Sequence, residues 1–128
     1  MRRAGVAAVF ALLLLLPRDA GAGSFLAEAS GLSVELASEP GRPMRGRDTV
    51  YTLWLRDPAG RPVAGAKVTL TGRMPDGMTV LAPLRASSEA GMYLGRVLFT
   101  MEGGWRLTVR ILQADTPLEL SFTEQVAR

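Results

Sequence analysis

The sequence predicts an all-β protein: a signal peptide followed by an antiparallel immunoglobulin-like β-sandwich of about seven strands. Three observations lead to this prediction. From residue 31 onward, apolar and polar side chains alternate with a period of two, as in strands with one buried face and one solvated face. Short segments rich in glycine and proline separate the alternating runs. After residue 22, no stretch has the 3.6-residue repeat of an amphipathic helix.

Residues 1–22 have the features of a secretory signal peptide. Two arginines follow the initiating methionine, a 13-residue apolar run comes next, and Ala20-Gly21-Ala22 has the spacing of a cleavage site. As a helix the apolar run would extend about 20 Å, which is shorter than the ~30 Å hydrocarbon core of a bilayer. We therefore expect residues 1–22 to direct export and then to be cleaved; a retained membrane anchor is the alternative.

The remainder of the chain has the length of one domain. We expect residues 23–30 to form a flexible tether and residues 31–128 to form the β-sandwich. The 128-residue chain contains no cysteine and no histidine. This composition excludes disulfides, thiolate nucleophiles, histidine-ligated metals and Ser-His-Asp catalysis.

Charge and motif content exclude further classes of function. The formal net charge is +3, and most of the excess lies in residues 1–22, so the exported chain would be nearly balanced. Nucleic acids bind clustered positive charge, so we expect no nucleic-acid partner. The acidic side chains are scattered through predicted turns, and no phosphate-binding loop is present. We therefore expect a protein without enzymatic activity.

The predicted strands follow one another at short, regular intervals, which is typical of a sandwich of the immunoglobulin type. The fourth strand is a weaker run over residues 79–84. The residues expected to point inward from the other six strands are, in order, Leu32, Val34 and Leu36; Tyr51, Leu53 and Leu55; Ala66, Val68 and Leu70; Tyr93, Val97 and Phe99; Trp105, Leu107, Val109 and Ile111; and Leu118, Leu120 and Phe122.

Turn residues lie between the predicted strands. Asp57-Pro58-Ala59-Gly60 has proline at the second position and glycine at the last, so we expect it to close a hairpin. Residues 74–78 (MPDGM) form a second such turn. The other predicted turns cover residues 39–43, 87–91, 102–104 and 113–117.

The order of four segments resembles a known family. These segments are RDPAGRPVAGAKVTL at 56–70, MPDGM at 74–78, EAGMY at 89–93 and FTMEGGWRLTVRI at 99–111. Together they resemble the FixH/YtkA-like family of exported bacterial domains. The resemblance covers roughly residues 31–126. It implies an immunoglobulin-like sandwich in the periplasm or at the extracytoplasmic membrane face, associated with copper delivery and respiratory oxidase assembly.

Methionine is the soft metal donor of this chain, because thioether sulfur suits Cu(I). In an antiparallel array, the connections after the first, third and fifth strands leave from the same end of the sandwich. The residues expected there are Met44, Met74, Met78, Met101 and Trp105. We predict a Cu(I) site formed by Met74, Met78 and Met101, with Trp105 as a lid and Met44 as a fourth contact.

A packing role is the alternative for the same methionines. Methionine fills irregular gaps in cores and packs on aromatic rings, so Met101 could plug one end of the sandwich against Trp105. Met74 and Met78 could cap the same core. Met92 starts the fifth strand and should lie at the opposite end.

A second candidate surface is the loop GRPMRGRD at residues 41–48. Arg42, Arg45 and Arg47 could bind anionic lipid headgroups or an acidic face of a membrane protein. A solvated loop that keeps the surface soluble is the alternative. Trp54 alternates with the inward set, so we expect it on the outer face, either as an interface anchor or partly covered by its neighbours.

These observations favour a non-enzymatic, exported accessory module that acts near the membrane in copper handling or oxidase assembly. Its expected partner is a membrane or periplasmic protein. The alternative is a generic immunoglobulin-like interaction or adhesion domain that binds no metal.

Overall fold

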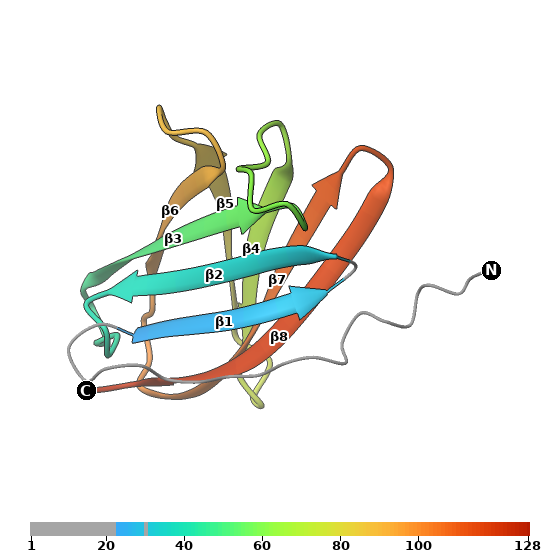
Figure 1. The fold of residues 1–128 in the computed structure, drawn as a ribbon. Helices are drawn as coiled ribbons and strands as arrows, with labels where there is room; N and C mark the ends of the chain where they lie inside the picture. Colours follow the sequence, from blue (N-terminus) through green and yellow to red (C-terminus); the bar gives the residue numbers. More distant parts are fainter. Residues whose placement is uncertain (1–22, 30) are drawn as a thin grey trace.

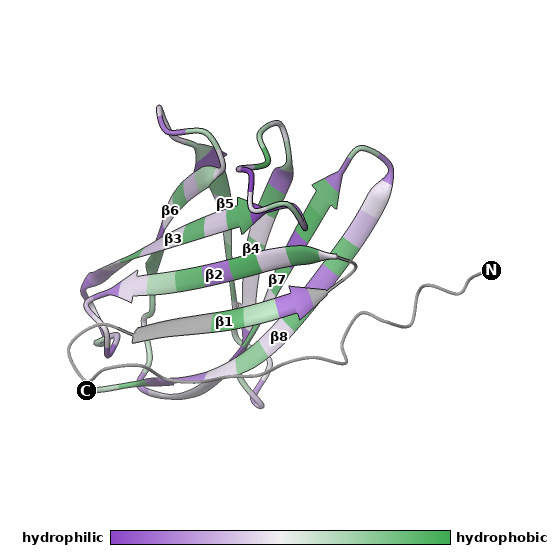
Figure 2. Cartoon of the chain, in the orientation of Figure 1, coloured by the Kyte–Doolittle hydropathy of each residue, from purple (hydrophilic) through white to green (hydrophobic). Residues whose placement is uncertain are grey.

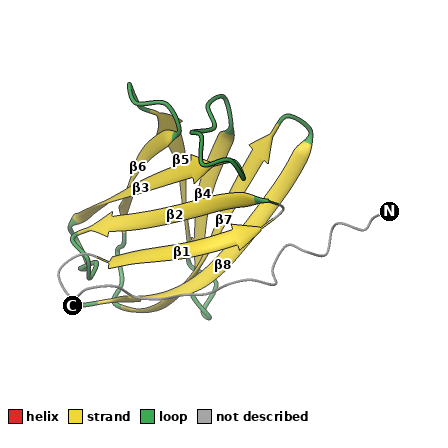
Figure 3. Cartoon of the chain, in the orientation of Figure 1, coloured by secondary structure: helices red, strands yellow, loops and turns green. Residues whose placement is uncertain are grey.

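The computed structural model describes residues 23–29 and 31–128, and every regular element within these ranges is a β-strand (Figures 1 and 3). The predicted signal peptide, residues 1–22, lies outside them. Within the described ranges no helix is long and apolar enough to cross a bilayer. The strands are β1 Gly23–Ala29, β2 Leu32–Glu39, β3 Asp48–Arg56, β4 Lys67–Arg73, β5 Thr79–Ala86, β6 Met92–Leu98, β7 Gly103–Gln113 and β8 Thr116–Val126.

The strands form one antiparallel sheet in the order β1-β2-β3-β6-β5-β4-β7-β8, which curls into two layers (Figure 1). One layer contains β1, β2, β3 and β6, and the other contains β5, β4, β7 and β8. The junction between them is short, because β5 pairs with β6 only through Arg85–Leu94 and Ala86–Tyr93. The predicted antiparallel β-sandwich is therefore confirmed, with eight strands in the described ranges in place of about seven.

The additional strand is β1. We predicted a flexible tether over residues 23–30, and this prediction is wrong for residues 23–29. They pair along their whole length with β2, from Gly23 opposite Ser38 to Ala29 opposite Leu32. The pairing covers backbone groups on β2 that would otherwise form an open edge. The alternating pattern within these few residues is too short to identify a strand without its neighbour.

The core lies between the two layers, and Figure 2 shows apolar and polar residues alternating along the strands. In β3 and β7 every second side chain is buried, as the period-two pattern predicts. Tyr51, Tyr93, Phe99 and Trp105 are the largest fully buried side chains. Trp54 is half-buried on the outward side of β3, as predicted.

The turn at Asp57–Gly60 forms as predicted and closes a short antiparallel hairpin, in which Arg56 bridges to Pro62 and the Val63 N–H donates to the Leu55 carbonyl at 2.9 Å. The Asp57 carboxylate accepts the backbone N–H groups of Ala59 and Arg61, both at 2.9 Å, and Gly60 has a φ of +83°. The following strand β4 pairs with β5 and β7 in the other layer. The hairpin does not continue into β4, because turn chemistry is local, whereas the layer joined by the next strand depends on long-range pairing.

Candidate functional site

Three loops lie at the same end of the sandwich, along its lower side in Figure 1: β2–β3, β4–β5 and β6–β7. The backbone N–H of Gly46 donates to the Phe99 carbonyl at 2.9 Å, which joins the first loop to the third. The Thr100 Oγ1 and Met78 Sδ atoms lie 3.7 Å apart, which joins the second loop to the third. We call this end, with Met44, Met74, Met78, Met101 and Trp105, the methionine pole.

The β4–β5 hairpin presents Met74 and Met78. The Met74 N–H donates to the Met78 carbonyl at 2.9 Å, and the Asp76 carboxylate accepts the Met78 N–H at 2.9 Å. Gly77 supplies the positive φ of this turn, +100°. Met74 is partly buried against the core, whereas 38% of Met78 is exposed. The packing interpretation therefore describes Met74 well, and Met78 has a solvent-facing surface.

Met101 and Trp105 belong to the β6–β7 connection and the start of β7. The Trp105 indole N–H donates to the Met101 carbonyl at 3.0 Å, and its ring packs on Phe99 with centroids 5.2 Å apart. Trp105 is fully buried, and 39% of Met101 is exposed. Trp105 thus lies under the loops as part of the core, which is not the position of a lid over a surface site.

The β2–β3 loop carries Met44 and is anchored to the end of the chain. Arg45 N–H donates to the Ala127 carbonyl at 2.7 Å, and Met44 forms a parallel bridge with the same residue. The Arg47 Nη1 atom lies 3.9 Å from the Met44 sulfur. A guanidinium against that sulfur competes with any cation that would use it as a ligand.

The three arginines predicted as an anionic-surface contact are all exposed on this loop. Arg45 lies 3.5 Å from a Glu102 oxygen, and Arg128 lies 3.5 Å from the other oxygen of the same carboxylate. In the described part of the chain, Arg42 and Arg47 have no carboxylate partner. The positive charge of this loop is thus only partly offset.

Met92, at the start of β6, lies away from the methionine pole, as strand parity predicts. Its backbone N–H donates to the Glu89 carbonyl in the β5–β6 turn, at 3.1 Å. It is opposite Trp54 in the β3–β6 register. Met92 is therefore a natural internal control for any property attributed to the other methionines.

Across residues 23–29 and 31–128, no group of three or more His, Cys, Asp or Glu side chains could hold a metal ion. Protein sites for Mg²⁺, Ca²⁺ and Zn²⁺ are commonly built from such groups of oxygen or imidazole donors. The donors gathered at the methionine pole are thioethers, which suit a soft monovalent ion. The methionine pole thus presents thioether sulfur as its metal donor, the donor type that suits Cu(I).

Sequence reasoning missed a buried polar pair that connects the two layers. The Tyr51 hydroxyl on β3 donates to the Glu124 Oε1 atom on β8 at 2.9 Å. Burial raises the pKa of the Glu124 carboxyl to about 7, and burial beside this carboxyl raises the pKa of the Tyr51 phenol well above its usual value. The sequence does contain the signal, because Glu124 continues the inward series of Leu118, Leu120 and Phe122.

Solved structures share this fold. A DUF4426 family protein from Pseudomonas aeruginosa superposes with a TM-score of 0.66 at 16% identity, over 81% of this chain and 94% of that chain. The Lin-41 filamin domain gives a TM-score of 0.54 at 25% identity, over 82% of this chain and 92% of that chain. A DUF4785 family protein from Legionella pneumophila gives 0.54 at 13% identity, over 77% of this chain and 29% of that one. These similarities establish an immunoglobulin- or filamin-like fold.

Sequence comparison identifies the family. No curated protein matches the chain. The sequence pattern of the family described as YtkA-like matches residues 26–110, which span β1 to the greater part of β7. This match covers most of the two layers and the three loops of the methionine pole. The chain therefore belongs to the YtkA-like family.

Proposed function

We propose that this chain is a non-enzymatic accessory domain that works outside the cytoplasm, beside the membrane, and takes up Cu(I) at its methionine pole. Membership of the YtkA-like family supports the extracytoplasmic assignment. The observation that carries the copper proposal is the contact between the β4–β5 and β6–β7 loops at Met78 and Thr100. Through this contact Met74, Met78 and Met101 share one end of the sandwich.

The proposed ligands are the sulfurs of Met74, Met78 and Met101. Two of these side chains are more than a third exposed, so an ion can reach them without unfolding of the core. Met44 stays outside this set, because Arg47 already approaches its sulfur. Trp105 supports the loops from below through its hydrogen bond to Met101.

Anaerobic competition against a chromogenic Cu(I) chelator tests this proposal. We expect the protein to withdraw micromolar Cu(I) from the chelator. Substitutions M74L, M78L and M101L should each weaken the binding about ten-fold, which corresponds to ~1.4 kcal/mol. Leucine keeps the side-chain volume and removes the sulfur, so the fold is preserved.

The matched control is M92L, which removes a thioether away from the methionine pole. We expect M92L to retain full affinity. The proposal would be contradicted if the protein did not compete for micromolar copper. It would also be contradicted if M92L lost as much Cu(I) affinity as M74L, M78L and M101L.

A second candidate function is protein interaction without metal, and one observation favours it. Trp54 borders a recess of about 150 Å³ that is also lined by Arg56, Pro62 and Glu89. A half-buried tryptophan beside a recess is a suitable anchor for a protein partner. Under this alternative, partner binding depends on Trp54 and is unchanged in M74L and M78L.

We also propose that the β2–β3 loop faces the membrane or an acidic surface of a membrane or periplasmic partner. Arg42 and Arg47 are exposed on this loop and have no carboxylate partner within the described residues. Each such cation contributes about 1 kcal/mol near an anionic surface. This orientation would direct the methionine pole toward the partner.

A further inference from the structure

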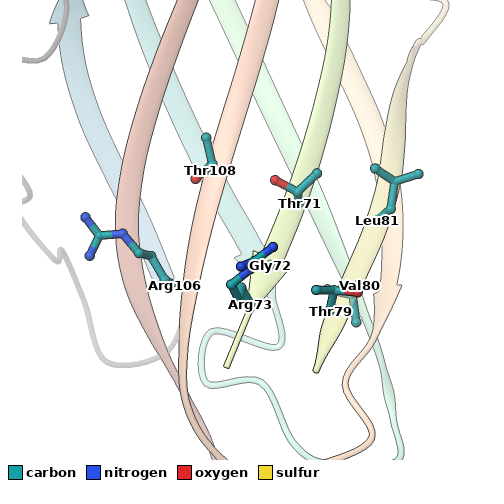
Figure 4. A pocket seen from close by; sticks show the side chains of 8 residues that line it. All are labelled: Thr71, Gly72, Arg73, Thr79, Val80, Leu81, Arg106 and Thr108. Carbon is teal, nitrogen blue, oxygen red and sulfur yellow. The ribbon is translucent and has the colours of Figure 1, made fainter. Parts of the chain in front are cut away.

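The outer face of the β5-β4-β7-β8 layer contains a recess of about 410 Å³ (Figure 4). It lies on the opposite side of these strands from the core. We call it the arginine recess. The outward side chains that line it are Thr71, Arg73, Thr79, Leu81, Arg106 and Thr108.

Two arginines in this recess are direct cross-strand neighbours. Arg73 on β4 is opposite Arg106 on β7 in the antiparallel register. Like charges in directly opposite positions destabilise a sheet. Within residues 23–29 and 31–128 neither arginine has an ion pair, although Arg110 on the same β7 face lies 3.5 Å from Glu119. Figure 4 shows the side chain of Arg106 extending away from Arg73.

Threonine hydroxyls complete the lining. Thr71 is opposite Thr108 in the register, and Thr79 is opposite Arg73. The Thr108 hydroxyl shares a hydrogen bond of 3.1 Å with Ser121. In the described ranges the Thr71 and Thr79 hydroxyls have no partner, and no carboxylate lines the recess. Two guanidinium groups and free hydroxyls are the donors that recognise a tetrahedral oxyanion.

The charge of the whole face favours the same ligand. On the four strands of this layer, the outward charged side chains are all cationic except Glu119, which is close to Arg110. The cations are Lys67, Arg73, Arg85, Arg106 and Arg110. A face of one sign attracts counter-charged ligands and raises their local concentration.

We propose that the arginine recess binds a phosphate group, with Arg73 and Arg106 as its cationic contacts and the threonine hydroxyls as further donors. A bound anion relieves the repulsion between the two guanidinium groups, so it stabilises the folded domain. At about 410 Å³ the recess is more than ten times the roughly 30 Å³ occupied by one water, so a phosphate with a substituent fits. The ligand is therefore either free phosphate or the phosphate of a lipid headgroup. This proposal is independent of copper binding.

Titration with inorganic phosphate at fixed ionic strength, against a chloride reference, provides the first arm of the test. We expect phosphate to raise the melting temperature and to shift backbone amide resonances of β4, β5 and β7. R73Q and R106Q should each weaken binding about ten-fold or more, because each removes charge-assisted hydrogen bonds. Both side chains are exposed, so the variants should fold, which their melting curves establish.

The control is R85Q, which removes the same charge from the same face outside the recess. It should change the affinity by less than two-fold. The second arm measures co-sedimentation with phosphatidylcholine vesicles, with and without phosphatidylglycerol. Loss of binding in R73Q and R106Q, with binding retained in R85Q, supports the proposal. The arm in which this pattern is seen, inorganic phosphate or vesicles, identifies the source of the phosphate. Failure to bind in both arms, or equal loss in R85Q, overturns it.

Discussion

Replacement of Gly95 by alanine should destabilise the domain by about 3 kcal/mol, which is the upper range for forced overpacking of a core. Gly95 points inward from β6 where β5 leaves that strand to join the other layer. A Cβ atom there would lie 2.7 Å from the Pro83 carbonyl oxygen and would collide with the Leu84 side chain. The carbonyl belongs to the backbone, so it can move away only if the strand shifts.

Urea unfolding followed by tryptophan fluorescence measures this effect. The matched control is G104A, whose Cβ would meet only the end of the flexible Gln125 side chain, at 3.2 Å. G104A should change the free energy of unfolding by less than about 1 kcal/mol. If G95A were as stable as G104A, this result would contradict the close approach of β5 to β6 at Gly95.

The free energy of unfolding should fall as the pH rises from about 4.5 to about 8, because of Glu124. Burial raises the pKa of its carboxyl to about 7 in the folded state, above the value near 4.5 of an unfolded chain. Between these values the folded protein holds a proton that the unfolded chain has lost, so stability decreases with pH. The free energy of unfolding should therefore fall by about 3 kcal/mol in total across this pH range, at 1.36 kcal/mol for each unit by which the two pKa values differ.

The variant E124Q separates this effect from other titrations. Its amide oxygen still accepts the Tyr51 hydroxyl, but the side chain cannot ionise. We expect E124Q to resemble the wild type at pH 5 and to exceed its stability at pH 8. Asp57 acts in a different range, because backbone hydrogen bonds from Arg61 and Ala59 lower its pKa. The same pH slope in E124Q and the wild type would contradict the assignment.

Strand positions and buried faces were predictable because they depend on alternation within each strand. The inward positions of Leu53, Leu70 and Leu107 are all fully buried. The convergence of three loops was also predictable, because strand parity alone determines which connections share an end. The YtkA-like resemblance was confirmed by the match over residues 26–110.

Features that depend on pairing between distant strands were not predictable. The opposition of Arg73 and Arg106 requires the register of β4 with β7. The hydrogen bond between Tyr51 and Glu124 joins two residues that are 73 positions apart in the sequence and lie in different layers. The layer change after Asp57 follows from the same long-range pairing. Local alternation determines which face of a strand each residue occupies, but not which residues of two distant strands lie opposite each other.

The central claim is that Met74, Met78 and Met101 act together as soft-metal ligands. NMR spectra of protein labelled with ¹³C at the methionine methyl groups test this residue by residue during anaerobic titration with Cu(I). We predict that these three methyl resonances shift together and saturate at one equivalent of copper, while the Met92 resonance stays unchanged. No shift at any methionine, or equal shifts at Met92 and at the methionine pole, would contradict the claim.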